Sequence, residues 1–316
     1  MDPIILQIIL LVVGFLLLIK GADIFVDGAS NVAYNFKIPA VIVGLTIVAF
    51  GTSAPEAAMS ITYAQAGNAA SSLTNVIGSN IFNILVVVGV SALIGKLTVE
   101  KILIKRDFPF LVVSTIGLLL IALTIHEISK LCGIIFLILI IAYVYVLVQE
   151  ARKDRDAMSE DIEVRLSIPK SFIYIILGIA GIIIGAKLVE VNASAIGLRA
   201  GLSAALVGLT IVAVGTSLPE LVTSVTALKK GENGMVIGNV LGSSIFNILF
   251  ILGLAGVFSP TPLKIEPKIA LDIFIMTAIT IIGALFAYTQ NEVDKKEGIV
   301  LVIIYIVYIA FRIMTN

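Results

Sequence analysis

The chain has 316 residues, of which 59% are hydrophobic and 13% are charged, and its formal net charge at pH 7 is zero. A soluble globular protein has about twice that charged fraction, so a large soluble helical core is excluded for lack of polar sequence to coat it. The neutral balance indicates no nucleic-acid or polyanion partner. The single cysteine, Cys132, excludes an internal disulfide and a cysteine-based metal cluster.

Several apolar runs reach the roughly 18–20 residues that a helix needs to cross a bilayer. No basic stretch or small-residue cleavage site precedes the first run, so we expect a retained helix and not a signal peptide. The pattern predicts an all-α polytopic membrane protein with ten transmembrane helices. In chain order, the predicted spans are 4–34, 39–65, 74–95, 108–126, 131–149, 169–198, 203–228, 235–258, 269–288 and 297–314.

One long polar segment, EARKDRDAMSEDIEVR at 150–165, divides the chain near its middle. Its alternating charge signs are typical of a solvated linker. We predict a first five-helix repeat over 1–149, a charged cytoplasmic linker over 150–168 and a second five-helix repeat over 169–316. The two repeats would form one integrated transmembrane domain.

Two segments of the first half recur in the second half without gaps. VGLTIVAFGTSAPEAAMSIT and TNVIGSNIFNIL correspond to VGLTIVAVGTSLPELVTSVT and GNVLGSSIFNIL, with matched positions 164 residues apart. This match is an internal duplication. Because five spans separate each residue from its partner, the two repeats have inverted topology. Inverted repeats are typical of secondary transporters, whose binding site lies at the repeat interface near the membrane midplane.

The lysines and arginines of the loops predict the orientation of the chain. With the N-terminus outside, most of these residues fall on the cytoplasmic side, which is the side that the positive-inside rule favours. We therefore expect both termini outside and the central linker in the cytoplasm.

Glu56 and Glu220 are matched residues of the first pair of segments. They are the only acidic residues deep inside predicted spans. A charge at the bilayer centre costs at least about 2.5–3.5 kcal/mol, so such residues are usually functional. The alternative is a structural ion pair. Basic residues well inside spans are Lys20 and Lys187, near the span ends. There, snorkelling or pairing with Asp23, Asp27 or Glu190 is easier.

Proline and glycine beside each glutamate predict a broken helix. Pro55 has no N–H and Gly51 gives the backbone room, which should free carbonyls near Gly51 and Ala49. Irregular backbone at this depth is tolerated only where it lines a polar cavity. The second copy repeats the arrangement with Pro219, Gly215 and Ala213.

Hydroxyls and amides accompany both glutamates. Thr52 shares a helix face with Glu56, and in the second signature a serine and an asparagine are four residues apart in each copy. An oxygen-only set suits hard cations such as Na⁺, Ca²⁺ or Mg²⁺ and not zinc or copper. The alternative for GSNIFN and GSSIFN is helix packing, with Gly78 and Gly242 allowing close approach and the polar residues as interhelical glue.

Other chemistries lack support in the sequence. The lone His126 lies in a predicted external loop and is expected at the surface. No nucleophile–base pair or nucleotide motif accompanies the glutamates, so we expect no enzyme, no prosthetic group and no nucleotide partner. Transport would be driven by an ion gradient.

At these residues the sequence resembles the cation/calcium exchanger superfamily, whose two alpha repeats carry G-T-S-x-P-E and G-N-x-x-G-S-x-x-x-N/D. Over essentially the whole chain it is similar to the short prokaryotic sodium/calcium exchangers. The resemblance implies exchange of Na⁺ for Ca²⁺ by alternating access, with the first and sixth helices sliding over a rigid core. We expect a protein of the prokaryotic cell membrane that works as a monomer in the lipid bilayer.

The resemblance also implies a cation site. Glu56 and Glu220 would hold Ca²⁺, and the carbonyls of Ala49 and Ala213 would serve outer Na⁺ sites. The remaining ligands would be Thr52, Ser53, Thr216, Ser217, Ser79, Asn83, Ser243 and Asn247.

The sequence departs from the family pattern at two positions. Asn247 stands where many relatives have Asp, which removes a charge and argues against K⁺ co-transport. Thr74 stands where the second copy has Gly238. The proton/calcium branch of the superfamily usually has GNxxE in place of GNxxGS. The absence of GNxxE from this sequence therefore favours Na⁺ over H⁺ as the driving ion. A Ca²⁺/H⁺ or other divalent cation/H⁺ exchanger, a cation channel and a non-transporting membrane scaffold or receptor remain alternatives.

Overall fold

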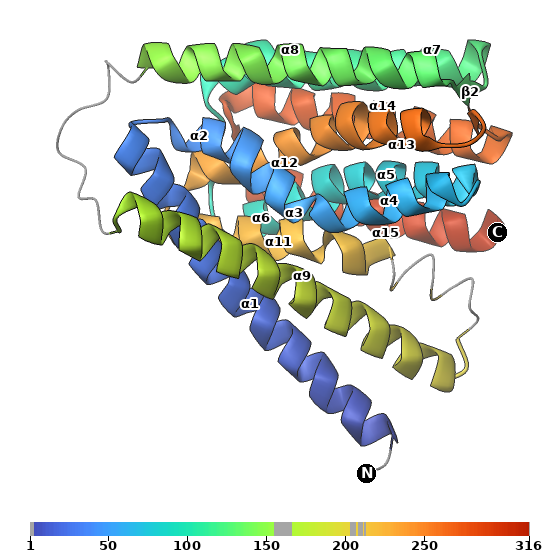
Figure 1. Ribbon diagram of the computed structural model, residues 1–316, viewed down its shortest axis with the longest axis horizontal. Helices are drawn as coiled ribbons and strands as arrows, with labels where there is room; N and C mark the ends of the chain where they lie inside the picture. Colours follow the sequence, from blue (N-terminus) through green and yellow to red (C-terminus); the bar gives the residue numbers. More distant parts are fainter. Residues whose placement is uncertain (1–2, 155–165, 203–206, 208–210, 212, 316) are drawn as a thin grey trace.

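The computed structural model describes residues 3–154, 166–202, 207, 211 and 213–315, and these residues are almost entirely helical (Figure 1). The first half contains α1 (Pro3–Phe36), α2 (Ala40–Val43), the π-helical turn η1 (Gly44–Val48), α3 (Ala49–Thr52), α4 (Ala54–Gln65), α5 (Ala69–Phe82), η2 (Asn83–Val87), α6 (Val88–Ile94), η3 (Leu103–Asp107), α7 (Phe108–Thr124) and α8 (Lys130–Asp154). The second half contains α9 (Ile168–Arg199), α11 (Ala213–Lys229), α12 (Asn233–Phe246), η5 (Asn247–Ile251), α13 (Leu252–Phe258), α14 (Pro267–Gln290) and α15 (Lys295–Thr315).

Eight of the described helices are long and apolar enough to cross a membrane, and a bent pair brings the number to as many as nine. The bent pair joins Ala40–Thr52 to Ala54–Gln65 at an angle of 50°. The seventh predicted span, 203–228, includes residues outside the described ranges. The polytopic helical fold is therefore confirmed, and the count of ten spans stays a prediction. The same holds for the linker expected over 150–168, of which 155–165 lie outside the described residues.

α1 and α9 pack closely along each other and run obliquely to the other helices, with the N-terminal half of α1 extending away from them (Figure 1). Glycines allow this close approach. A Cβ atom on Gly21 would lie 2.7 Å from the amide nitrogen of Ile182, and one on Gly178 would lie 2.6 Å from Cα of Phe25. Small residues that bring two backbones together are typical of helix pairs in membranes.

The two halves also interlock through α12, which packs against α2, η1 and α3. A Cβ atom on Gly242 would lie 2.6 Å from the carbonyl oxygen of Leu45. The equivalent glycine of the first half behaves differently, because a Cβ atom on Gly78 would have no heavy atom within 4 Å. The expected role in close packing is therefore confirmed for Gly242 and wrong for Gly78.

Two short antiparallel ladders join one half of the chain to the other. β1 (Leu97–Thr98) pairs with β4 (Glu292–Val293), and β2 (Glu127–Ile128) pairs with β3 (Leu263–Lys264). His126, just before β2, is exposed as predicted, and its carbonyl accepts a hydrogen bond from the amide of Ile265 at 2.8 Å. The ladders connect the loops after α6 and before α15, and the loops before α8 and before α14.

Two buried aspartates were not anticipated as buried acids. Asp107 accepts hydrogen bonds from Tyr143 at 2.6 Å and from the guanidinium of Arg106. Asp272 accepts a hydrogen bond from Tyr308 at 3.3 Å and lies 3.4 Å from the guanidinium of Arg312. In both pairs the tyrosine follows 36 residues after the aspartate. Each charge thus has a basic partner, which marks it as structural.

The unequal environments of the two equivalent glycines lead to a stability prediction. Gly242→Ala inserts a methyl group against the backbone of η1 and should lower the stability by about 1–3 kcal/mol, as overpacking does. Gly78→Ala meets open space and should leave the stability unchanged or slightly higher. Thermal denaturation in detergent, followed by size-exclusion chromatography, measures both. Equal losses in the two variants would contradict this account of the packing.

Candidate functional site

The helix that carries Glu56 bends at Ser53, where the backbone leaves the helical region with φ −84° and ψ 6°. Pro55 lies in the first turn of α4, where its missing N–H costs no hydrogen bond. The predicted break is therefore confirmed, but it lies at Ser53 and not at Gly51. The carbonyl of Ala49 is not free, because it accepts a hydrogen bond from the amide of Ser53 at 3.0 Å.

The second copy does not repeat this break within the described residues. α11 continues from Ala213 to Lys229 with Pro219 in its interior. The prediction of a broken helix at Pro219 is thus wrong for this segment. Proline removes one backbone hydrogen bond and need not interrupt a membrane helix whose neighbours hold it. Such a neighbour is α9, since a Cβ atom on Gly215 would lie 3.1 Å from the side chain of Glu190.

Glu56 and Glu220 are both fully buried, and each is bonded by a serine of the other half. Ser53 Oγ donates to Oε1 of Glu220 at 3.0 Å, and Ser217 Oγ donates to Oε1 of Glu56 at 3.3 Å. Among the described residues, none is hydrogen-bonded to Oε2 of either glutamate. The ion pairs of the described residues include neither glutamate, so the alternative of a structural ion pair is not supported.

Thr52 links the first half to α12. Its hydroxyl donates to Oδ1 of Asn239 at 3.1 Å and lies 3.4 Å from the hydroxyl of Ser243. Ser243 in turn lies within 3.4 Å of the carbonyl oxygen of Ala49. Hydroxyl and carbonyl oxygens of both halves therefore converge beside the glutamates.

The amide of Asn247 crosses between the halves. Its Nδ2 donates to Oγ of Ser79 at 3.0 Å and to Oδ1 of Asn80 at 2.9 Å. Oδ1 of Asn247 and both polar side-chain atoms of Asn83 are buried without a hydrogen-bond partner. Buried polar groups are normally satisfied, so unsatisfied oxygens beside two carboxylates are suited to a cation.

Behind each glutamate lies an asparagine–serine pair that the sequence analysis did not single out. Nδ2 of Asn75 donates to Oγ of Ser60 at 2.8 Å and to the carbonyl oxygen of Glu56 at 3.3 Å. In the second half, Nδ2 of Asn239 donates to Oγ of Ser224 at 3.0 Å and lies 3.5 Å from the carbonyl oxygen of Glu220. The signal was present in the sequence as a serine four residues after each glutamate.

Contacts between the two halves link Thr52 with Ser243, Ser53 with Glu220, Ser217 with Glu56 and Asn247 with Ser79, and eleven of the twelve residues predicted for the site are buried. The buried members are Ala49, Thr52, Ser53, Glu56, Ser79, Asn83, Thr216, Ser217, Glu220, Ser243 and Asn247. Ala213 begins α11. No group of three or more His, Cys, Asp or Glu side chains that could share a metal ion occurs in the described part of the chain. The donors are hydroxyls, amides, carbonyls and two carboxylates, which is the oxygen chemistry of Na⁺ and Ca²⁺.

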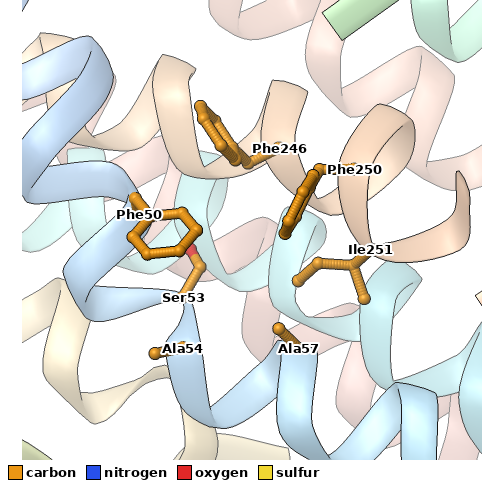
Figure 2. A pocket seen from close by; sticks show the side chains of 7 residues that line it. All are labelled: Phe50, Ser53, Ala54, Ala57, Phe246, Phe250 and Ile251. Atoms are coloured by element: carbon orange, nitrogen blue, oxygen red, sulfur yellow. The ribbon is translucent and has the colours of Figure 1, made fainter. Parts of the chain in front are cut away.

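An apolar pocket adjoins the bend on its other side (Figure 2). Phe50 makes edge-to-face contacts with Phe246 and Phe250, with ring centroids 6.0 Å apart in each pair. Ser53 contributes the one polar side chain among the lining residues, which also include Ala54, Ala57 and Ile251. The pocket offers no set of ligands for a cation, and its rings keep that side of Ser53 apolar.

A search of protein families finds the sodium/calcium exchanger protein family over residues 6–149 and 170–314. The chain belongs to this family. The two matched stretches leave out the predicted linker, so each half of the exchanger matches. The protein is thus a multi-pass membrane transporter of the cation/calcium antiporter type.

Relatives of similar length support the assignment. The putative antiporter CaxA of Alkalimonas amylolytica is 35% identical, over 95% of the exchanger and 96% of the relative. The sodium/calcium exchanger MaX1 of Methanosarcina acetivorans is 33% identical, over 95% and 97%. A solved structure of the sodium–calcium exchanger NCX_Mj soaked with Na⁺ and Ca²⁺ matches with a TM-score of 0.84 and 32% identity. The match covers 97% of the present chain and 98% of the NCX_Mj chain.

The asparagine–serine pairs lead to a prediction about transport. Ser224→Ala removes one acceptor of Asn239, a hydrogen bond worth about 0.5–1.5 kcal/mol, and loosens the turn that carries Glu220. We expect the half-saturating Ca²⁺ concentration of exchange to rise about threefold to tenfold, and Ser224→Thr to restore it. Thr223→Val is the matched control, because the Thr223 hydroxyl has no hydrogen-bond partner. Equal effects of Ser224→Ala and Thr223→Val would refute the positioning role.

Proposed function

We propose that the protein exchanges Na⁺ for Ca²⁺ across the membrane, with the transported cations held between Glu56 and Glu220. The observation that carries the proposal is the pair of buried carboxylates without a basic partner among the described residues. Each has one oxygen occupied by a serine of the other half and one oxygen without a partner. Two uncompensated negative charges in the membrane interior require positive charge, and one Ca²⁺ or two Na⁺ would supply it.

The proposed ligands are the twelve residues predicted from the sequence. The carboxylates would lie at the centre, flanked by Thr52, Ser53, Thr216 and Ser217, with the carbonyls of Ala49 and Ala213 on the outer sides. The Ala49 carbonyl, which accepts a hydrogen bond from the Ser53 amide, would bind the cation with its second lone pair. The set is completed by Ser79, Asn83, Ser243 and Asn247. Na⁺ and Ca²⁺ accept six or more oxygen ligands in flexible geometry, so hydroxyls and carbonyls from several helices suit them.

Alternating access follows from the inverted repeats. Two halves of opposite orientation give inward-facing and outward-facing states of similar energy around one site. The charged loops support an orientation with both termini outside and the linker in the cytoplasm, in the cell membrane of a prokaryote. We propose the monomer as the functional unit, since both glutamates come from one chain.

Coupling to Na⁺ is favoured over coupling to H⁺. The relatives named as sodium/calcium exchangers support this choice. The amides of Asn83 and Asn247 support it as well, because an amide neither takes up nor releases a proton near neutral pH. A Ca²⁺/H⁺ exchanger is the alternative outcome of the test below.

Radiolabelled Ca²⁺ uptake into proteoliposomes tests the proposal. Vesicles loaded with Na⁺ should take up Ca²⁺, whereas vesicles loaded with K⁺ or choline should not. Glu220→Gln removes one of the two charges and should abolish uptake, because the site then cannot balance a divalent ion. Glu266→Gln, at an exposed acid, is the control.

The competing outcomes are distinct. Uptake driven by a pH gradient without Na⁺ would replace the proposal with proton exchange. Glu220→Gln protein that no longer elutes as a single species from size-exclusion chromatography would indicate a structural role for the carboxylate.

Asn247 is the residue that tests the amide ligands. Asn247→Asp adds a negative charge but loses the donors to Ser79 and Asn80. The new carboxylate would face Oδ1 of Asn80, so the Asn80 amide must turn and give up its bond to the Ser244 carbonyl at 3.2 Å. We expect a folded protein with a changed ratio of Na⁺ to Ca²⁺ affinity, of about threefold or more. Unchanged affinities for both ions would show that Asn247 is not a ligand.

A further inference from the structure

A lysine in the turn between α11 and α12 forms ion pairs with two aspartates of α1. Nζ of Lys230, in the turn between α11 and α12, lies 2.7 Å from Oδ1 of Asp23 and 2.6 Å from Oδ1 of Asp27. It also donates to the carbonyl oxygen of Asp23 at 2.8 Å. Of the two alternatives for Lys20, snorkelling or pairing with Asp23 or Asp27, pairing is therefore not supported. The partner of the two aspartates lies about 200 residues further along the chain, on a different element.

A second polar contact joins the same two elements. The hydroxyl of Tyr34, near the end of α1, donates to the carboxylate of Glu232 in the same turn. The turn thus contacts α1 at positions 23, 27 and 34, over about three helical turns. Contacts through several long side chains fix the position of α1 along its own axis.

α1 is coupled more intimately to α9 than to this turn. The glycines of both helices bring their backbones together. At the end of α1, Oδ1 of Asn31 accepts a hydrogen bond from the amide of Leu166 at 2.9 Å, and Nδ2 of Asn35 donates to the Leu166 carbonyl at 2.9 Å. Leu166 lies two residues before the start of α9. α1 and α9 therefore behave as one unit, and the contacts of Lys230 join that unit to the remaining helices.

The equivalent place in the other half lacks this contact. The position that corresponds to Lys230 is Ala66, in the turn between α4 and α5. The position that corresponds to Asp23 is Lys187, which pairs with Glu190 of its own helix at 3.0 Å. In the part of the chain that the structure describes, an ion pair therefore joins the α1–α9 unit to the other helices at one end and not at the equivalent place.

We propose that Lys230, Asp23 and Asp27 form a one-sided latch that holds α1 in the position seen here and sets the balance between the two access states. The latch rests on the proposed alternating access. A contact made in one state and broken in the other stabilises the first state by its own free energy. Because the inverted half has no counterpart, the two states of the exchanger differ in energy by this contact.

Transport measured from the two membrane faces tests the latch. The half-saturating Ca²⁺ concentration at each face depends on the fraction of molecules open to it. Lys230→Gln should therefore change the two values by about threefold in opposite directions, whereas Lys229→Gln, at the neighbouring exposed lysine, should change neither. Adding Asp23→Asn and Asp27→Asn to Lys230→Gln should cause no further change, since all three act through one contact.

A labelling experiment reports on the latch even if Ca²⁺ is not the transported ion. Ser30 on α1 is 7% exposed and its hydroxyl has no partner, so Ser30→Cys is a near-isosteric probe. Cys132→Ser removes the other thiol. In detergent, maleimide should label the probe at least about threefold faster with Lys230→Gln than with Lys229→Gln.

Several results would overturn the latch. These are equal labelling rates in the two variants, transport constants that do not change, and constants that change in the same direction at both faces. Absence of Ca²⁺ transport by the unmodified protein, together with faster labelling of Lys230→Gln, would refute the proposed function and retain the latch.

Discussion

The burial of two carboxylates that have no basic partner among the described residues is the constraint on which the rest of the structure depends. Glu56 and Glu220 are fully buried, and each receives one hydrogen bond from a serine of the opposite half. An ionised carboxylate removed from water is costly unless oriented dipoles or a counter-charge surround it. Neither half provides this environment alone, so the two halves must close around the same point. The buried aspartates, which have arginine partners, show how the chain neutralises charges that serve the fold.

The two halves are closely similar around Glu56 and Glu220 and differ a short distance away. The asparagine–serine pairs behind the glutamates recur with similar geometry. In contrast, the first half bends at Ser53 while α11 continues through Pro219. Asn80 faces Ser244 across the interface, where a strict repeat would place the same residue twice. The chain thus keeps the proposed cation ligands identical in the two copies and lets the surroundings diverge, which would allow the two proposed access states to differ.

Much of this arrangement could be predicted from the sequence. Hydropathy gave the helices because backbone groups in lipid must be satisfied within a helix. The duplicated motif indicated the candidate site, because matched residues of inverted repeats are expected to meet at their interface. The sequence could not show that the bend falls at Ser53 or that Gly78 faces open space, since both depend on packing from distant helices. It also could not show that Asp23 pairs with Lys230, because local spacing favoured a partner on the same helix.

The two short ladders bear on how the protein is made. β1 pairs with β4, and β2 pairs with β3. Neither ladder can therefore form until most of the second half has left the ribosome. Before Ser217 is made, the nascent first half carries Glu56 without the serine that bonds it, and β1 and β2 stay unpaired for longer still. If synthesis stops after the first half, the polypeptide has the Glu56 carboxylate without its serine partner and the strands β1 and β2 without their partners. A membrane quality-control protease would recognise such a fragment by features that the finished protein conceals.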